Sequence, residues 1–262
     1  MPEQADKRRF SSVENSWSIV QYLMEHEQAG ITDISSAVGM AKSTVHTHLT
    51  TLRSLGIVVQ EQQTYRLSLK FVQIGNEIRN RWLLYNAGRP VVDRLANTSQ
   101  EYVHLLAIDD GEIIYLYGSG GEQAVATEYF RKDIQHPIRV NALASAKAVI
   151  AFLPEADRDS LIKRISFDSY TDYTITNESE LREELQAIRE RGFALNDQEE
   201  ILGTRAVGAP IFSTRRTVIG SISITKPRSR MAGDDFHQTV PEEIMSAANE
   251  IEARVTSETQ TN

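Results

Sequence analysis

The chain has 262 residues, a formal net charge of −8 and no cysteine. This length allows one or two domains, each large enough for its own core. The acidic balance argues against a generally basic nucleic-acid coat, and the lack of cysteine excludes disulfides and thiolate metal sites. The sequence has no apolar run of about 18 residues and no apolar signal core at its start, so we expect a cytoplasmic protein.

Charge is unevenly distributed along the chain. Residues 1–70 hold seven Lys or Arg and seven Asp or Glu, whereas the remainder holds 21 against 29. A neutral head on an acidic body suits one specific DNA contact, with the body held away from the phosphates.

The first predicted helix begins near a Ser-x-x-Glu capping box at Ser11 and Glu14. Behind this box, four apolar residues recur at helical spacing: Val13, Trp17, Val20 and Met24. We expect this helix to support the elements that follow, with Trp17 in the core.

Residues 31–54 predict two short helices. Apolar residues recur at helical spacing in residues 31–38, and Gly39 interrupts the pattern, as expected where two helices meet at a steep angle. In the second helix Val45, Leu49 and Leu52 share one face. The opposite face carries small polar or cationic groups suited to phosphate oxygens and base edges: Lys42, Ser43, His46, Thr47, Thr50 and Arg53.

Residues 57–59 and 64–67 predict two short strands around a polar tip, which completes a winged helix-turn-helix. No Asp or Glu occurs from Ile34 through Gln60, although the chain contains 36. Because a carboxylate would repel phosphates, this run favours DNA binding over the alternative of a helical hairpin packed in a core. The candidate DNA-binding residues are Lys42, Ser43, Thr44, His46, Thr47, Arg53, Gln62, Gln63, Thr64 and Arg66.

The next predicted helix spans residues 70–85. Five residues form an apolar stripe along it: Phe71, Ile74, Ile78, Trp82 and Tyr85. We interpret it as a connecting helix that packs against a second copy of itself; packing on its own neighbouring domain is the alternative. Gly88 and Pro90 are expected to end this helix and start another. We therefore place the winged helix in residues 1–68, a dimerising linker helix in 69–88 and a further domain in 89–262.

The remainder alternates strands and helices. Strands are predicted at residues 102–108 and 112–118, joined by a hairpin turn, and a third at 125–130. Helices are predicted at residues 142–153, 155–165 and 177–191, the last capped by Asn177 and ended by Gly192. Strands at 205–212 and 218–225 and a final helix at 241–255 follow. The pattern predicts an α/β (α+β) domain with a central antiparallel sheet.

No catalytic constellation emerges from the sequence. It has no Gly-x-Ser-x-Gly elbow, phosphate loop or His-Glu-x-x-His motif. His46 and His48 lie two residues apart on a helix, so they point in different directions and cannot chelate one ion. The acidic run at residues 197–200 is interpreted as a solvated loop. We therefore expect no enzyme activity, no cofactor and no metal site.

In this order and spacing, five segments resemble the IclR-type family of bacterial and archaeal transcription regulators. They are residues 42–46, 141–148, 192–200, 208–212 and 221–224, and the resemblance extends from about Val13 to Val255. Arg outnumbers Lys 21 to 7 in an acidic chain, for which a salt-rich cytoplasm, as in a halophilic archaeon, and G+C-rich coding are alternative explanations.

The resemblance implies a winged-helix DNA reader, a linker helix that dimerises and a GAF-like effector domain. It implies a dimer or tetramer that binds operator DNA and controls catabolic genes in response to a small organic acid or sugar-derived metabolite. The effector-binding positions that it implies are Phe130, Ala144, Ser145, Asn196, Ala206, Ser223 and Thr225. Backbone N–H groups at the start of the helix at Ala144 would also suit a carboxylate.

The chain departs from the family pattern at two of these places. Alanines at 144 and 146 replace two glycines, and alanine resists positive φ and close backbone approach. Asn196 replaces an acid and tolerates an anionic ligand better.

Two alternatives to a ligand-responsive regulator stay open. One is an enzyme acting on a small organic acid with a DNA-binding regulatory head, for which no nucleophile with its base is found. The other is a DNA-binding protein without a ligand.

Overall fold

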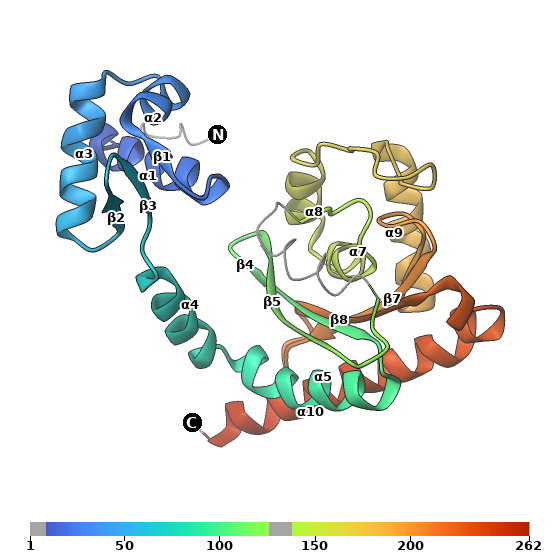
Figure 1. The fold of residues 1–262 in the computed structure, drawn as a ribbon. Coiled ribbons are helices and arrows are strands. Elements are labelled where there is room, and N and C mark those ends of the chain that lie inside the picture. Colours follow the sequence, from blue (N-terminus) through green and yellow to red (C-terminus); the bar gives the residue numbers. More distant parts are fainter. Residues whose placement is uncertain (1–8, 126–137, 262) are drawn as a thin grey trace, which may run out of the picture. The chain divides into compact units, whose positions relative to one another are not determined.

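Residues 9–125 and 138–261 are described by the computed structural model, in which the chain divides into two units, residues 1–78 and 79–262 (Figure 1). Each unit contains a hydrophobic core of its own. All of the strand predicted at 125–130 except its first residue lies outside the described residues, and so does the candidate residue Phe130. No helix within those two ranges is both long and apolar enough to cross a membrane.

The first unit contains a winged fold. The helices of this fold are α1 (Ser11–Glu25), α2 (Ile31–Val38) and α3 (Lys42–Ser54). Strands β1 (Ala29–Gly30), β2 (Val58–Glu61) and β3 (Thr64–Leu67) form an antiparallel sheet in the order β1-β3-β2. The helix-turn-helix and wing predicted from the sequence are therefore present. The pairing of β1 with β3 was not predicted, because two residues are too few to carry a strand pattern.

Helix α1 does not bury the face that its sequence predicted. Ile19 and Leu23 are in the core, whereas the Trp17 side chain is 56% exposed, so its expected place in the core is wrong. The apolar residues of this helix outnumber those that its small unit can cover, and spacing alone does not show which of them are covered. The capping box is also absent, because the helix already begins at Ser11 and no side chain caps it.

A single helix was expected over residues 70–85, but two are present. Helix α4 (Lys70–Arg81) ends before Trp82, whose extended backbone begins α5 (Leu83–Ser99). Gly88 and Pro90 lie inside α5 rather than at its start. A Cβ on Gly88 would lie 2.6 Å from the Leu105 side chain, so this glycine permits close packing of the helix on the sheet instead of ending a helix.

The second unit is built on a five-stranded antiparallel sheet in the order β5-β4-β8-β7-β6. The strands are β4 (Tyr102–Asp109), β5 (Glu112–Gly120), β6 (Ala194–Asp197), β7 (Thr204–Phe212) and β8 (Val218–Pro227). The prediction of a mixed α/β fold with a central antiparallel sheet is confirmed. The edge strand β6 was missed, since its four residues lie within an expected loop.

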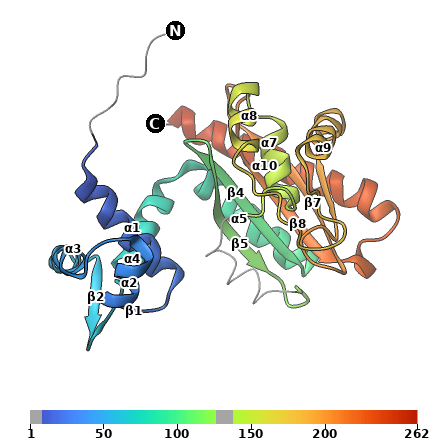
Figure 2. The same cartoon turned by 90° about the horizontal axis from the view of Figure 1, so that it is seen from above.

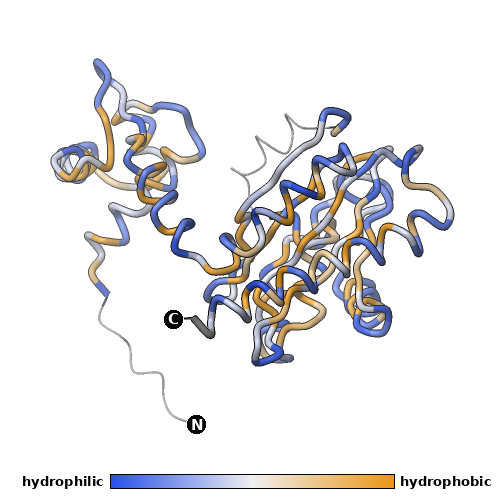
Figure 3. Tube along the Cα trace, turned by 90° about the horizontal axis from the view of Figure 1, so that it is seen from below, coloured by the Kyte–Doolittle hydropathy of each residue, from blue (hydrophilic) through white to orange (hydrophobic). Residues whose placement is uncertain are grey.

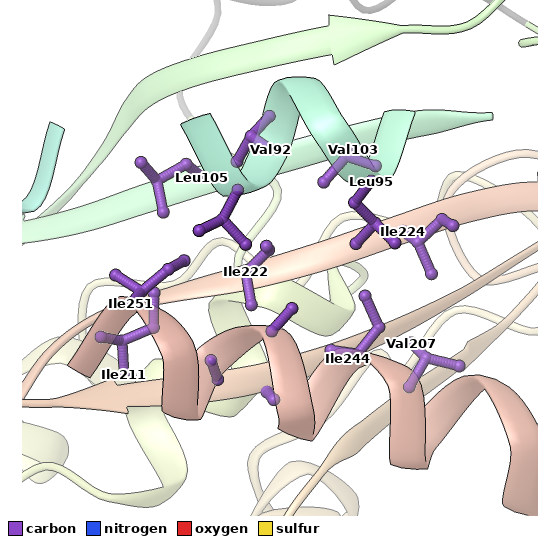
Figure 4. Packing of buried hydrophobic residues seen from close by; sticks show 14 of the residues in the cluster. Val92, Leu95, Val103, Leu105, Val207, Ile211, Ile222, Ile224, Ile244 and Ile251 are labelled. Atoms are coloured by element: carbon purple, nitrogen blue, oxygen red, sulfur yellow. The ribbon is translucent and has the colours of Figure 1, made fainter. Parts of the chain in front are cut away.

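Helices cover both faces of this sheet (Figures 1 and 2). Helices α5 and α10 (Val240–Thr261) pack on one face, where aliphatic side chains of the strands and helices interlock (Figure 4). Helices α7 (Ala144–Ala151), α8 (Glu155–Ile162) and α9 (Glu178–Arg191) belong to the second core, on the opposite face. Along the helices hydrophilic and hydrophobic segments alternate, as expected for elements with one buried side (Figure 3).

Several turns and caps follow the local sequence directly. Asp110 and Gly111, with φ of 46° and 77°, close the β4–β5 hairpin as predicted. Asn177 caps α9 by accepting a hydrogen bond from the Glu180 N–H at 2.9 Å, and Gly192 ends the helix in a left-handed conformation.

Candidate functional site

The exposed face of α3 is the first candidate site. Val45, Leu49 and Leu52 are buried, and this anchors the helix so that its polar side faces solvent. The hydroxyls of Thr47 and Thr50 donate only to carbonyl oxygens four residues earlier, at 3.0 and 2.8 Å. The surface therefore presents small side chains that are held by local bonds and lacks any carboxylate on α3 itself.

A chain of contacts joins α3 to the wing. The Arg53 guanidinium donates to the side chain of Gln60, and the Gln60 amide donates to the carbonyl oxygen of Gln62 at 3.0 Å. In the wing, Arg66 forms an ion pair with Glu61 at 2.6 Å. Arg53 and Arg66 are thus already engaged in the free protein, and Glu61 places a negative charge in the wing that the sequence prediction did not consider.

The structure brings the ten candidate DNA-binding residues together on α3 and the wing hairpin. Thr64 and Arg66 are half-buried; the Thr64 hydroxyl donates to the Gln28 side chain at 3.0 Å. The remaining eight are exposed: Lys42, Ser43, Thr44, His46, Thr47, Arg53, Gln62 and Gln63.

The second candidate site lies on the sheet face that carries α7. Cross-strand pairing aligns Asn196, Ala206, Thr225 and Tyr102 in one row across four strands. These are positions far apart in the sequence, and three of them belong to the effector-binding set implied by the family resemblance.

A cavity of about 500 Å³ opens beside this row, toward the β4–β5 hairpin. This volume is in the range of small-molecule sites. Its wall is made by the hairpin, the start of α7 with the segment before it, and the end of α8 with the segment after it. The lining residues are His104, Leu106, Glu112, Ile113, Ile114, Tyr115, Ile138, Arg139, Val140, Asn141, Leu143, Ser145, Leu161, Arg164, Ile165, Ser166, Tyr170 and Glu200.

Of the described effector-binding candidates, only Ser145 lines this cavity. Ala144 and Ala206 are buried in the core on the α7 side of the sheet. Ser223 and Thr225 are buried in β8, where the Thr225 hydroxyl lies 3.4 Å from Nε2 of His104. Thr225 therefore contacts a cavity residue without lining the cavity itself.

Asn196 has a structural role in this fold. Its amide donates to the carbonyl oxygen of Ala142 at 2.7 Å, and its side-chain oxygen accepts the Glu199 N–H at 2.8 Å. Next to it, Lys147 is completely buried and forms an ion pair with both Glu199 carboxylate oxygens at 2.6 Å. Burial raises the pKa of Glu199, while Lys147 acts in the opposite direction.

Close backbone packing fixes the start of α7. A Cβ on Gly208 of β7 would lie 2.8 Å from the backbone of Ala144, so only glycine permits this approach. The Ser221 hydroxyl of β8 also donates to the carbonyl oxygen of Ser145 at 2.8 Å. Two neighbouring strands thus hold the helix start against the sheet and orient Ser145 at the cavity.

His104 is a cavity residue whose pKa is strongly lowered. Burial lowers its pKa from the ordinary 6.5 to about 3, so the imidazole is neutral at physiological pH. Its ring also packs edge-on against Tyr115, with centroids 5.7 Å apart. His104 was not among the predicted site residues, although a histidine inside the otherwise apolar strand predicted at residues 102–108 was a usable signal. Arg139, Arg164 and Tyr170 come from irregular segments that carry no comparable pattern.

Within residues 9–125 and 138–261, no group of three His, Asp or Glu side chains lies close enough to hold a metal ion. What the site offers chemically is a cavity with a partly aliphatic wall, a neutral imidazole, a serine hydroxyl and four charged side chains.

Comparison with known proteins matches both units. Two family profiles, "IclR helix-turn-helix domain" and "Bacterial transcriptional regulator IclR C-terminal", match residues 12–62 and 80–253. The probable HTH-type transcriptional regulator ArcR of Halobacterium salinarum is 38% identical, over 97% of this chain and 98% of that protein.

Solved structures agree on the fold. A putative IclR-type regulator from a Silicibacter species superposes with a TM-score of 0.78 at 22% identity, covering 93% of this chain and 96% of that one. An IclR homologue from Microbacterium hydrocarbonoxydans, solved with 4-hydroxybenzoate, gives a TM-score of 0.77 at 17% identity, covering 94% and 99%. With both units matched, the chain belongs to the IclR family of transcription regulators.

Proposed function

We propose that this protein binds specific operator sequences through α3 and the wing, and controls catabolic genes in response to a small metabolite bound by residues 79–262. The observation that carries the proposal is the exposed, acid-free polar face of α3 on a winged helix with its own core. Such a helix is the element that enters the major groove in helix-turn-helix proteins.

The side chains divide by chemistry into two roles. His46 and Thr47 are exposed in the first turns of α3 and have the size and polarity to reach base edges. Lys42 supplies a charge for the phosphates, and the wing tip at Gln62 and Gln63 reaches the flanking backbone.

A salt titration of DNA binding tests this assignment. Genome-wide mapping of bound sites would supply the operator, and fluorescence anisotropy would measure affinity at several salt concentrations. Lys42→Ala should weaken binding to all sequences and reduce the slope of log K against log salt by about 0.9. His46→Ala should instead change base preference, by about 1–3 kcal/mol at one position.

Lys163→Ala is the matched control, because Lys163 is an exposed lysine of the second unit. An unchanged salt slope for Lys42→Ala, or the same loss for both lysine variants, would remove Lys42 from the interface.

The cavity in the second unit is the proposed effector site. Its volume, its place beside the central sheet and its buried neutral imidazole support this role. A thermal-shift panel of organic acids, sugar acids and aromatic compounds would test it, since a ligand that binds only the folded state raises the melting temperature. Stabilisation by no compound, together with intact operator binding, would favour a ligand-independent DNA-binding protein.

The protein is further proposed to act as a homodimer or a dimer of dimers. Its first unit exposes large apolar side chains on α1 and α4, a surface that suits association: Val13, Trp17, Met24, Val72, Ile74 and Ile78. Light scattering on the Ile78→Glu variant should show a shift toward monomer, and an unchanged mass would place the contact elsewhere.

A further inference from the structure

The polar side chains of the cavity are already engaged within the protein. Both amide hydrogens of Asn141 are used, donating to the carbonyl oxygens of Asp168 and Ile175 at 3.0 and 2.8 Å. Ser166 donates to the Asp168 carboxylate at 2.6 Å. These bonds serve the loop at residues 166–175 and leave neither side chain a hydrogen to donate to a hydroxyl of a ligand.

The charged residues of the cavity are also engaged within the protein. Arg164 donates to Glu112 and to the carbonyl oxygen of Gly111, which ties the end of α8 to the β4–β5 hairpin. The Arg139 guanidinium stacks over the Tyr170 ring at 4.4 Å from its centroid. Arg139, Tyr170 and Glu200 each make further interactions within the chain. With two arginines against two glutamates, the lining residues that the structure describes carry no formal net charge.

Ser145 is the exception among these polar residues. Among the described residues its hydroxyl makes no hydrogen bond, although its carbonyl oxygen accepts one from Ser221. The Tyr115 hydroxyl, by contrast, is buried against Gly118, where it presents almost no surface to the cavity. His104 is already engaged, with Nε2 3.4 Å from the Thr225 hydroxyl and a further interaction within the chain, so among the described lining residues the Ser145 hydroxyl is the group best placed for polar recognition, beside the neutral imidazole.

The rest of the wall is aliphatic. Eight of the eighteen lining residues are Leu, Ile or Val: Leu106, Ile113, Ile114, Ile138, Val140, Leu143, Leu161 and Ile165. A polyhydroxylated ligand would leave hydroxyls unpaired against this wall, at about 1–3 kcal/mol for each buried group. An apolar ring would instead gain about 25 cal/mol for each Å² removed from water.

We infer that this cavity selects a compound with an apolar, ring-sized body and a single hydrogen-bonding head, bound beside Ser145 and His104, in preference to a polyhydroxylated sugar acid. The inference deepens the proposed effector role and rests on it. It places the ligand beside the row that contains Asn196, Ala206 and Thr225, on the side of the β4–β5 hairpin.

Isothermal titration calorimetry on the full chain tests the ligand class. Benzoate and phenol share an apolar ring and differ in the charge of the head, whereas gluconate and pyruvate represent a polyhydroxylated acid and a small acid without a ring. The ring compounds should bind at least about tenfold more tightly than gluconate and pyruvate, a difference of about 1.4 kcal/mol. The ratio of benzoate to phenol then shows whether the head is anionic or neutral.

Variants test the location. Leu106→Trp places an indole in the cavity from β4 and should abolish ring binding. Ser145→Ala, a milder change, should weaken it several-fold while the preference for rings over gluconate stays. The matched control is Leu202→Trp, which adds the same side chain at an exposed position that does not line the cavity. Circular dichroism and operator binding report whether each variant is folded.

The inference is overturned if gluconate or pyruvate binds more tightly than both ring compounds, or if no ring compound binds. It is also overturned if Ser223→Ala removes ring binding while Leu106→Trp and Ser145→Ala retain it, because the ligand would then lie over β8. These results leave the regulator role standing as long as the wild-type chain binds its operator. If the wild-type chain does not bind operator DNA, the proposed function itself fails, whatever the ligand tests show.

Discussion

The exposed face of α3 and the wall of the cavity use polar side chains in opposite ways. On α3, Thr47 and Thr50 bond only to backbone within one turn of the helix. In the cavity, Asn141 bonds to carbonyl groups 27 and 34 residues away, and His104 contacts a hydroxyl 121 residues away. The first surface can exchange its contacts for those of DNA without altering the fold, whereas a ligand in the second must fit groups already fixed by tertiary structure.

The largest expected effect comes from the buried ion pair beside the cavity. Lys147→Met removes the charge that neutralises Glu199 in a site where Lys147 is completely buried. An unpaired buried charge costs about 3–5 kcal/mol, so urea unfolding should show a loss of that order in the free energy of unfolding. The same measurement on Lys42→Ala, on the exposed face of α3, should show a change within about 0.5 kcal/mol.

The double variant Lys147→Met with Glu199→Leu serves as the control. Replacing both partners by apolar groups removes the unpaired charge, so it should recover most of the stability lost in the single variant. If the double variant is as unstable as the single one, the cost lies in packing around Lys147 rather than in charge.

The local sequence was sufficient to predict the exposed polar surface of α3. The spacing of Val45, Leu49 and Leu52 fixes which face of that helix is buried, and the polar face follows from it. Helix α9 was predictable for a similar reason, because Asn177 and Gly192 mark its ends by backbone chemistry alone. Such features depend on residues within a few positions of one another.

The cavity could not be predicted to the same degree. Its wall depends on which strands pair and on where two irregular segments pack, and neither is encoded by a local pattern. The glycines show the same limit: Gly88 suggested a helix end, although it permits contact with Leu105. Trp17 likewise fits the apolar spacing of α1 but lies on its exposed side. Of the described positions that the family resemblance implied, only Ser145 lines the cavity.

A second prediction concerns how His104 makes the stability of the second unit depend on pH. Its pKa in the folded state is about 3, below the ordinary value of 6.5, so the unfolded chain binds a proton first as the pH falls. Its contribution to stability is complete above pH 6.5 and is lost between pH 6.5 and about 3, at up to about 1.4 kcal/mol per pH unit.

Urea unfolding at pH 7, 6 and 5 would isolate this term by comparing the wild type with His104→Gln. The glutamine side chain does not titrate and can still bond to Thr225, so the variant should lose less stability per pH unit than the wild type. Groups elsewhere that titrate in this range contribute equally to both proteins. Equal slopes for the two proteins would show that His104 accepts a proton in the folded state.

The smallest expected effect separates the wing from α3 within the DNA-binding surface. Glu61 pairs with Arg66 at 2.6 Å, and both side chains are partly exposed. Glu61→Gln should change the free energy of unfolding by less than about 1 kcal/mol, because exposed ion pairs contribute little. It should, however, tighten operator binding, since it removes a negative charge from the wing and releases Arg66. If the released arginine neutralises one phosphate, the slope of log K against log salt becomes steeper by about 0.9.

Glu122→Gln, which changes an exposed acid of the second unit, controls for the change in net charge. A tighter complex with an unchanged slope would mean that Glu61 acts only by repulsion and that Arg66 never reaches the DNA.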